Sequence, residues 1–257
     1  MKKVAFWSLL LLSFSSVAQQ MPDRRFSMGL RLGANYNQLT GESVGSPGAF
    51  YFDGKTAHTW GYTAALFFRR GGGTFFTQHE LGLSQKGGAF TIGGTGGQVN
   101  LKNVDVRFSN IDFTNLVGVR FFRLFRVNGG IVLSYNTGNN GDLGSIASDF
   151  LERKYSLQGQ LLQAMQAQVA GQQDQFSNAF KGISVNYQAG IGVDGGRFTF
   201  DLRYEGGITD VMKTKVDLGN ADWSSSVNEA LSRKVSLWQI TAGVGFGRAP
   251  KAYSASL

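Results

Sequence analysis

Residues 197–205 read RFTFDLRYE, a stretch in which large apolar side chains alternate with polar or charged ones. Successive side chains of a strand point to opposite faces, so one face here is apolar: Phe198, Phe200, Leu202 and Tyr204. The other face is polar or charged: Arg197, Thr199, Asp201, Arg203 and Glu205. Several other segments repeat this pattern. It favours a closed barrel with lipid outside and a polar interior over a soluble sandwich.

Eight segments carry this alternation, and each is long enough to cross a bilayer at the usual tilt. The expected strands cover residues 26–39, 60–70, 75–87, 108–120, 125–136, 183–193, 197–208 and 235–247. Leu116, which faces inward, and Asn115, which faces outward, break the pattern of the fourth segment. The sequence thus predicts an all-β fold, an eight-stranded antiparallel up-and-down transmembrane β-barrel.

Short and long connections alternate strictly between these segments. The short ones cover residues 71–74, 121–124 and 194–196, and the long ones cover 40–59, 88–107, 137–182 and 209–235. Barrels of the outer membrane have short periplasmic turns and longer external loops. With an even number of strands, both chain ends fall on the side of the short turns.

The beginning of the chain is typical of a secretory signal peptide. Residues 1–18 combine a basic start, a short apolar run and the small-residue ending Ser16-Val17-Ala18. The expected organisation is a signal peptide at 1–18, a periplasmic segment at 19–25, the barrel at 26–247 and a periplasmic tail at 248–257. The predicted location is the outer membrane of a Gram-negative cell, after cleavage of the signal peptide.

Residues 145–180, within the third long connection, have a helical pattern instead. A loose apolar stripe follows this Gln-rich segment and includes Phe150, Leu157, Leu161 and Met165. We expect a helical external loop. It either covers the mouth of the barrel or provides a docking surface for a protein partner.

Nine charged side chains are expected to face the barrel interior and to form a charge network there. They are Arg31, Glu80, Lys86, Asp112, Arg120, Arg126, Asp201, Arg203 and Glu205. The interior of an eight-stranded barrel is just wide enough for side chains to fill, so unpaired charges would be costly. We therefore expect a packed, salt-bridged interior, with Glu80 and Arg203 as the first pair to test. The alternative is a narrow polar path for protons or small ions.

The outer surface is expected to carry aromatic girdles at the membrane interfaces. Their members are Tyr36, Trp60, Phe68, Phe76, Phe121, Phe125, Tyr135, Tyr204 and Trp238. His79 falls on the outward face of its strand, near the membrane.

The sequence contains no strong motif for a catalytic, phosphate-binding or metal site. Ser43, Ser46, Asp53 and His58 could meet at the outer rim as a hydrolase site, although their spacing does not demand it. The glycine-rich 93–97 lacks the features of a phosphate-binding loop, and 139–142 lacks the spacing of a calcium loop. The chain has no Cys. Its net charge is +8, but the sequence contains no run of basic residues interleaved with aromatic ones. We expect no cofactor, no metal and no nucleic-acid partner. We expect the barrel to contact outer-membrane lipid and lipopolysaccharide.

Residues 77–88, TQHELGLSQKGG, resemble the "ELxYSQKG" strand of the PorT family of Bacteroidetes outer-membrane β-barrels. Residues 189–193 and 198–210 resemble that family's penultimate hairpin, and 240–246 its closing strand. Some relatives serve the type IX secretion system, and the resemblance transfers no catalytic residue. It implies a non-enzymatic scaffold or interaction component of the cell envelope, linked to protein secretion. A small-solute or ion pore and a rim-sited envelope enzyme are the alternatives.

Overall fold

The computed structural model describes residues 26–42, 44–45, 51–52, 56–71, 74–93, 102–122, 124–139, 182–211 and 232–246. It contains ten strands: β1 (Phe26–Thr40), β2 (Val44–Gly45), β3 (Tyr51–Phe52), β4 (Thr59–Arg70), β5 (Phe75–Gly93), β6 (Lys102–Phe121), β7 (Phe125–Asn139), β8 (Ile183–Gly195), β9 (Phe198–Gly207) and β10 (Lys234–Phe246). The expected signal peptide, the 19–25 segment, the 248–257 tail and the helical loop with Phe150, Leu157, Leu161 and Met165 lie outside the described residues.

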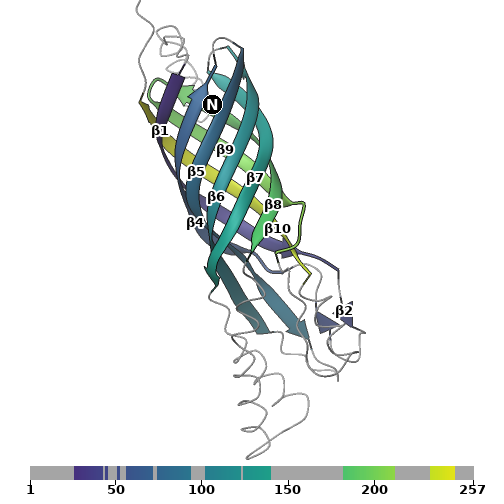
Figure 1. The fold of residues 1–257 in the computed structure, drawn as a ribbon. Coiled ribbons are helices and arrows are strands. Elements are labelled where there is room, and N and C mark those ends of the chain that lie inside the picture. The colour runs from purple at the N-terminus through teal and green to yellow at the C-terminus, as the bar shows by residue number, and fades with distance from the viewer. Residues whose placement is uncertain are drawn as a thin grey trace, which may run out of the picture.

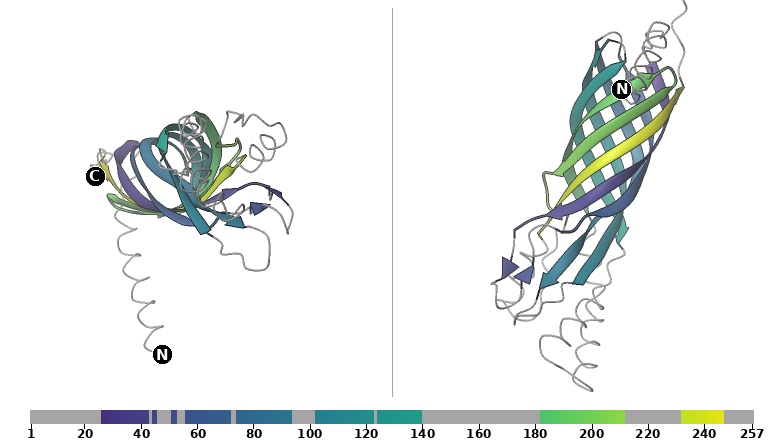
Figure 2. Two further views of the ribbon diagram at one scale, coloured as in Figure 1. Left: turned by 90° about the horizontal axis from the view of Figure 1, so that it is seen from below. Right: turned by 180° about the vertical axis from the view of Figure 1, so that it is seen from behind.

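Eight of these strands form a closed antiparallel barrel (Figures 1 and 2). Around the ring the order is β1, β4, β5, β6, β7, β8, β9 and β10, each strand pairing with the next along the chain. The first and last strands close the ring, from Met28 opposite Phe246 to Thr40 opposite Lys234. The predicted eight-stranded up-and-down barrel is confirmed. No helix in the described part of the chain is long and apolar enough to span a membrane.

The alternating sequence pattern produces two different walls. Apolar side chains cover the outside, and Leu32 and Ile240, for example, expose 66% and 64% of their surface. Their neighbours Arg31 and Gln239 point inward and expose only 1% and 6%. A soluble protein would bury the apolar side chains, whereas here the charged ones are buried. This inside-out arrangement fits a barrel whose outer wall contacts hydrocarbon.

Two strands are longer than the sequence indicated. The expected loop at 88–107 is wrong over most of its length, because β5 continues to Gly93 and β6 begins at Lys102. The two strands pair from Phe75 with Val119 to Ile92 with Lys102, and this hairpin extends past the other barrel strands (Figure 1). The pairing needs only the neighbouring strand, so it continues beyond the rim of the barrel.

The three short turns lie at the end of the barrel where the described chain begins and finishes. Residues 71–74 join β4 to β5, residues 122–124 join β6 to β7, and residues 196–197 join β8 to β9. Arg197 therefore belongs to a turn and is exposed. The sequence alternation, in contrast, predicts it on the charged, inward face of a strand. We refer below to this end as the short-turn end and to the opposite end as the long-loop end.

Candidate functional site: the barrel interior

Three ion pairs cross the barrel between strands that lie opposite each other in the ring. Arg69 of β4 binds Asp194 of β8, with 3.1 Å between Nη1 and Oδ2. Glu80 and Lys86 of β5 bind Arg203 and Glu205 of β9 at 2.8 Å and 2.5 Å, respectively. These three pairs, the cross-barrel ion pairs, therefore span the full width of the interior.

Glu80 is the most connected acid at the middle of the interior. Both of its oxygens accept hydrogen bonds from Arg203, at 2.8 and 2.9 Å, in a bidentate arrangement. The carboxylate also accepts from Arg31 Nη1 and from the amide of Gln78. Arg31 reaches Asp201 as well, at 2.8 Å. Three strands, β1, β5 and β9, are thus joined through one buried carboxylate and its partners.

A second group surrounds Lys86 nearer to the long-loop end. Its ammonium donates to Glu205 and to Ser134 Oγ at 2.9 Å, and it lies 3.2 Å from Asp112. Asn186 adds a hydrogen bond of 2.8 Å to Glu205. Lys86 and Glu205 are each only 1% exposed, so this charge pair is removed from bulk water.

Arginines dominate the short-turn end. Asp194 pairs there with Arg69, with Arg120 at 3.7 Å and with Arg126. Arg126 also binds Asp201 at 2.6 Å. Gly192 leaves the room for this second pair, since a Cβ atom at Gly192 would lie 2.5 Å from an Asp201 oxygen. The position of Arg126 therefore depends on residue 192 being a glycine, which has no side chain.

Two buried phenylalanines separate the guanidinium groups of this end. Phe67 lies against Arg31 and Arg69, at 5.2 and 5.5 Å from the ring centroid, and Phe76 lies against Arg69 and Arg120 at 5.4 and 5.8 Å. Such contacts attract a cation to the ring face and are worth about 2 kcal/mol or more when desolvated. Phe76 is 4% exposed, so its assignment to the outer aromatic girdle is wrong.

The paired strands explain how an aromatic ring fits inside. Phe76 lies opposite Gly118 of β6, and its ring occupies the space that a side chain at Gly118 would need, 2.3 Å from the ideal Cβ position. Covering a strand glycine with a neighbouring aromatic ring restores some of the packing that the glycine lacks.

Charge is unevenly distributed along the described interior. From the short-turn end to the middle, five arginines face three acids: Arg31, Arg69, Arg120, Arg126 and Arg203 against Glu80, Asp194 and Asp201. Lys86 alone faces Asp112 and Glu205. Arg233, buried directly before β10, adds one positive charge towards the long-loop end. Beyond Lys86 the buried side chains include apolar ones: Leu39, Val106, Phe108, Val235 and Leu237.

The nine charged residues expected from the sequence lie in this interior, and the sequence reasoning missed three further buried charged residues among those described: Arg69, Asp194 and Arg233. Arg69 and Asp194 follow the alternation of their strands, since the residues directly before them, Phe68 and Val193, point outward. Asp194 was assigned to a turn, but β8 continues to Gly195. Arg69 lies within the expected strand 60–70, where the alternation already places it inward, and extending the expected strand 183–193 by one residue would have found Asp194.

Two polar side chains on the outer wall contact each other. His79 and Asn115 are opposite one another on β5 and β6, and Nδ1 of His79 lies 2.5 Å from Oδ1 of Asn115. Since they face outward, this hydrogen bond satisfies part of their polarity where lipid offers no partner. The outward Asn115 that broke the strand pattern therefore has a partner.

The proposed rim site is only partly described. His58 stacks on Tyr36, with 4.3 Å between ring centroids and 9° between the planes. Ser43, Ser46 and Asp53 lie outside the described residues. Among the residues that the structure places, no group of three or more His, Cys, Asp or Glu is arranged to hold a metal ion.

The comparisons with known proteins point in one direction. A family model described as "Outer membrane protein beta-barrel domain" matches residues 17–213. No curated protein matches the chain.

Solved structures of similar fold include the following two. Ail of Yersinia pestis, in complex with the heparin analogue sucrose octasulfate, has 14% sequence identity and a TM-score of 0.39, over 86% of this chain and 99% of Ail. OprG of Pseudomonas aeruginosa has 11% identity and a TM-score of 0.36, over 88% of this chain and 99% of OprG.

Proposed function

Because the chain belongs to the outer membrane protein beta-barrel domain family, we propose that it is a non-enzymatic scaffold or interaction component of the cell envelope. The observation that carries this proposal is the set of cross-barrel ion pairs. Where Glu80 and Arg203 meet at 2.8 Å from opposite strands, side chains occupy the width of the barrel. A barrel filled in this way acts through its loops and its outer surface.

The resemblance of residues 77–88 to the PorT family supports a more specific role. We propose a link to the type IX secretion system of Bacteroidetes, with the segment 145–180 as the contact for another envelope protein. In this proposal residues 1–18 are a signal peptide that is removed on the way to the outer membrane.

A second candidate, a narrow path for small anions, is favoured by one observation. Five arginines face three acids between the short-turn end and the middle of the interior, which would attract anions to that end. The cross-barrel ion pairs argue against free passage, because an ion would have to separate each pair.

Recordings of the purified full-length protein in planar lipid bilayers distinguish these two candidates. We expect no large, stable conductance from the wild-type barrel. The double variant Glu80→Ala/Arg203→Ala removes the central pair and provides a control in which conductance is expected to rise. Stable, anion-selective conductance of the wild type would refute the filled barrel and support the pore.

Affinity purification from native membranes tests the interaction role. The full chain and a variant lacking residues 145–180 are compared, with a variant lacking residues 94–101 as the matched loop deletion. We expect specific envelope proteins to co-purify with the full chain and the control but not with the first deletion. The same partners from all three proteins would exclude 145–180 as the contact, and the absence of secretion components would refute the type IX link.

A further inference from the structure

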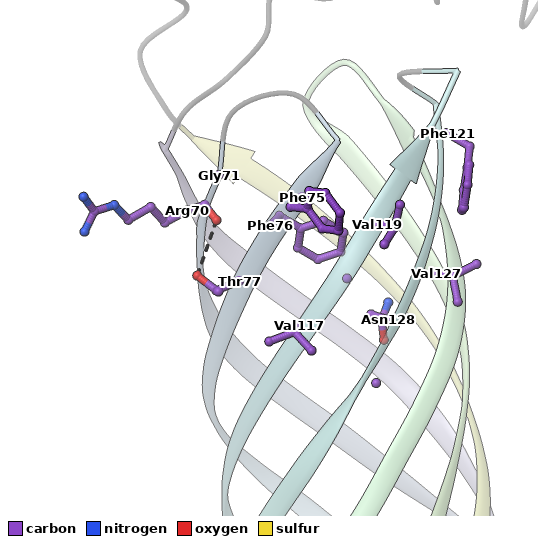
Figure 3. A pocket seen from close by; sticks show the side chains of 12 residues that line it. Arg70, Gly71, Phe75, Phe76, Thr77, Val117, Val119, Phe121, Val127 and Asn128 are labelled. Atoms are coloured by element: carbon purple, nitrogen blue, oxygen red, sulfur yellow. Dashed lines mark hydrogen bonds between the residues drawn. The ribbon is translucent and has the colours of Figure 1, made fainter.

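An apolar groove runs across the outer wall at the short-turn end of the barrel (Figure 3). Its volume is about 880 Å³, within the range of about 300–1,000 Å³ that is typical of sites for small molecules. The outward side chains that line it come from the ends of β5, β6 and β7: Phe75, Thr77, Val117, Val119, Phe121 and Val127. Phe75 and Val117 expose 73% and 65% of their surface, so the walls are open to a ligand from the membrane.

The groove exists because an outward position on β7 is a glycine. Gly129 lies between Val117 of β6 and Ala189 of β8, both of which have small side chains. A Cβ atom at Gly129 would have its nearest neighbour at 3.6 Å, the carbonyl oxygen of Gln188, which is ordinary contact. At Gly118, in contrast, the ring of Phe76 already fills the Cβ position.

The glycine at position 129 is therefore not required by the packing of the barrel. The residues with φ in the left-handed region do not include Gly129, so a larger residue could adopt its backbone conformation. A glycine inside a strand weakens it and often marks a place where a ligand approaches the backbone closely. The empty space above Gly129 is thus better explained by an occupant than by the fold.

A positive charge stands at the edge of this groove. Arg70, the last residue of β4, lines one edge of the groove and is exposed, and Figure 3 shows its side chain reaching away from the barrel wall, on the side away from Phe75 and Val117. Within the described ranges no carboxylate pairs with its guanidinium group. No Asp or Glu lines the groove. The site therefore combines an apolar groove with one exposed cation at its edge, where β4 ends.

We propose that this groove is a specific binding site for one anionic phospholipid of the periplasmic leaflet, with an acyl chain over Gly129 and its phosphate at Arg70. An apolar chain fits the valine and phenylalanine walls, and an anionic headgroup complements Arg70. A protein partner would be expected to meet more polar groups than the single hydroxyl of Thr77 and the guanidinium of Arg70. The site goes beyond the proposed scaffold role and does not depend on it.

Native mass spectrometry of the detergent-purified full-length protein tests this site, with phosphatidylglycerol and phosphatidylethanolamine as probes. We expect one phosphatidylglycerol to stay bound. Gly129→Leu fills the groove and should weaken binding at least about tenfold, because buried methylene contacts are lost. Arg70→Gln should weaken it about fivefold, which is the effect of one basic residue near an anionic lipid surface.

Two matched variants control for bulk and for charge. Ala64→Leu adds the same apolar side chain to the outer wall of β4 away from the groove, and Arg197→Gln removes an exposed charge from another short turn. Both should bind phosphatidylglycerol like the wild type. Altered migration on heating before gel electrophoresis verifies that every variant is a folded barrel.

Three results would overturn the proposal. The first is equal retention of phosphatidylglycerol by the groove variants and their controls. The second is equal binding of phosphatidylethanolamine, which would remove the role of Arg70. The third is a photo-crosslinker at position 117 that captures a protein in native membranes in place of lipid.

Discussion

Truncation of Glu80 to alanine removes the carboxylate on which the centre of the barrel interior depends. Glu80 is 6% exposed and accepts hydrogen bonds from Arg203, from Arg31 and from Gln78. Without it, two buried guanidinium groups lose a counter-charge while the wall around them stays in place. The variant therefore measures what an uncompensated charge costs inside this barrel.

The two arginines are affected differently. Arg31 keeps Asp201 at 2.8 Å, whereas Arg203 keeps only Gln188 Oε1 at 3.1 Å and a distant Asp201 oxygen at 3.8 Å. Removal of one partner from a buried ion pair costs about 3–5 kcal/mol, because the other charge is left buried. We expect Glu80→Ala to lower the free energy of unfolding by this amount, mainly through Arg203.

Urea unfolding in phospholipid vesicles, followed by tryptophan fluorescence, measures the loss. Arg203→Ala and the double variant complete a double-mutant cycle, for which we expect a coupling energy of about 1–3 kcal/mol. Glu80→Gln retains the size and part of the hydrogen bonding, so its loss should be smaller than that of Glu80→Ala.

A different result would refute the reasoning. If Glu80→Ala costs less than about 1 kcal/mol and the two truncations are additive, each charge is separately solvated by water. The interior would then be hydrated at the level of Glu80, and the argument against a pore would fall with it.

Three further variants test other contacts of the barrel. Gly118→Ala should destabilise it by about 1–3 kcal/mol, because the new methyl group displaces the ring of Phe76, and the combination with Phe76→Leu should recover part of that loss in the same unfolding assay. Replacing both His79 and Asn115 by leucine should raise the free energy of unfolding by about 1 kcal/mol or more, since two polar groups leave the lipid-facing wall; a loss of stability would contradict their exposure to lipid. Lys86→Met should cost about 3–5 kcal/mol by leaving Asp112 and Glu205 without their cation, and an unchanged urea midpoint would show that these acids are hydrated.

The sequence alone predicted the barrel well, because a strand's period of two is a local property. The alternation in 198–205 identified which side chains point inward without knowledge of any strand partner. Which acid meets which base depends on register and on the ring of eight strands, so the contact of Arg31 with both Glu80 and Asp201 could not be derived.

The misses are at strand ends, where local patterns are weakest. Phe76 has the composition of an interfacial aromatic residue, yet it shares the inward side of Gln78 and Glu80, and only the glycine opposite it on β6 gives its ring a place inside. The extension of β5 past Gly87 was missed because two glycines and a threonine lie among the residues that follow. These residues stay in the strand since β6 offers them continuous partners up to Ile92.

The cross-barrel ion pairs join the first half of the barrel to the second. In the first four barrel strands, four basic residues and two acids face inward, a surplus of two positive charges: Arg31, Arg69, Lys86 and Arg120 against Glu80 and Asp112. In the last four, together with Arg233 directly before β10, three arginines meet three acids and leave no surplus: Arg126, Arg203 and Arg233 against Asp194, Asp201 and Glu205.

The first half cannot neutralise itself. Glu80 and Arg203 are 123 positions apart, so their pair forms only when the ring closes. A half-finished sheet would hold bare charges against hydrocarbon, at a cost that its own hydrogen bonds could not offset. Insertion into the membrane and closure of the ring must therefore occur together, because Arg31, Arg69 and Lys86 meet carboxylates that β8 and β9 supply.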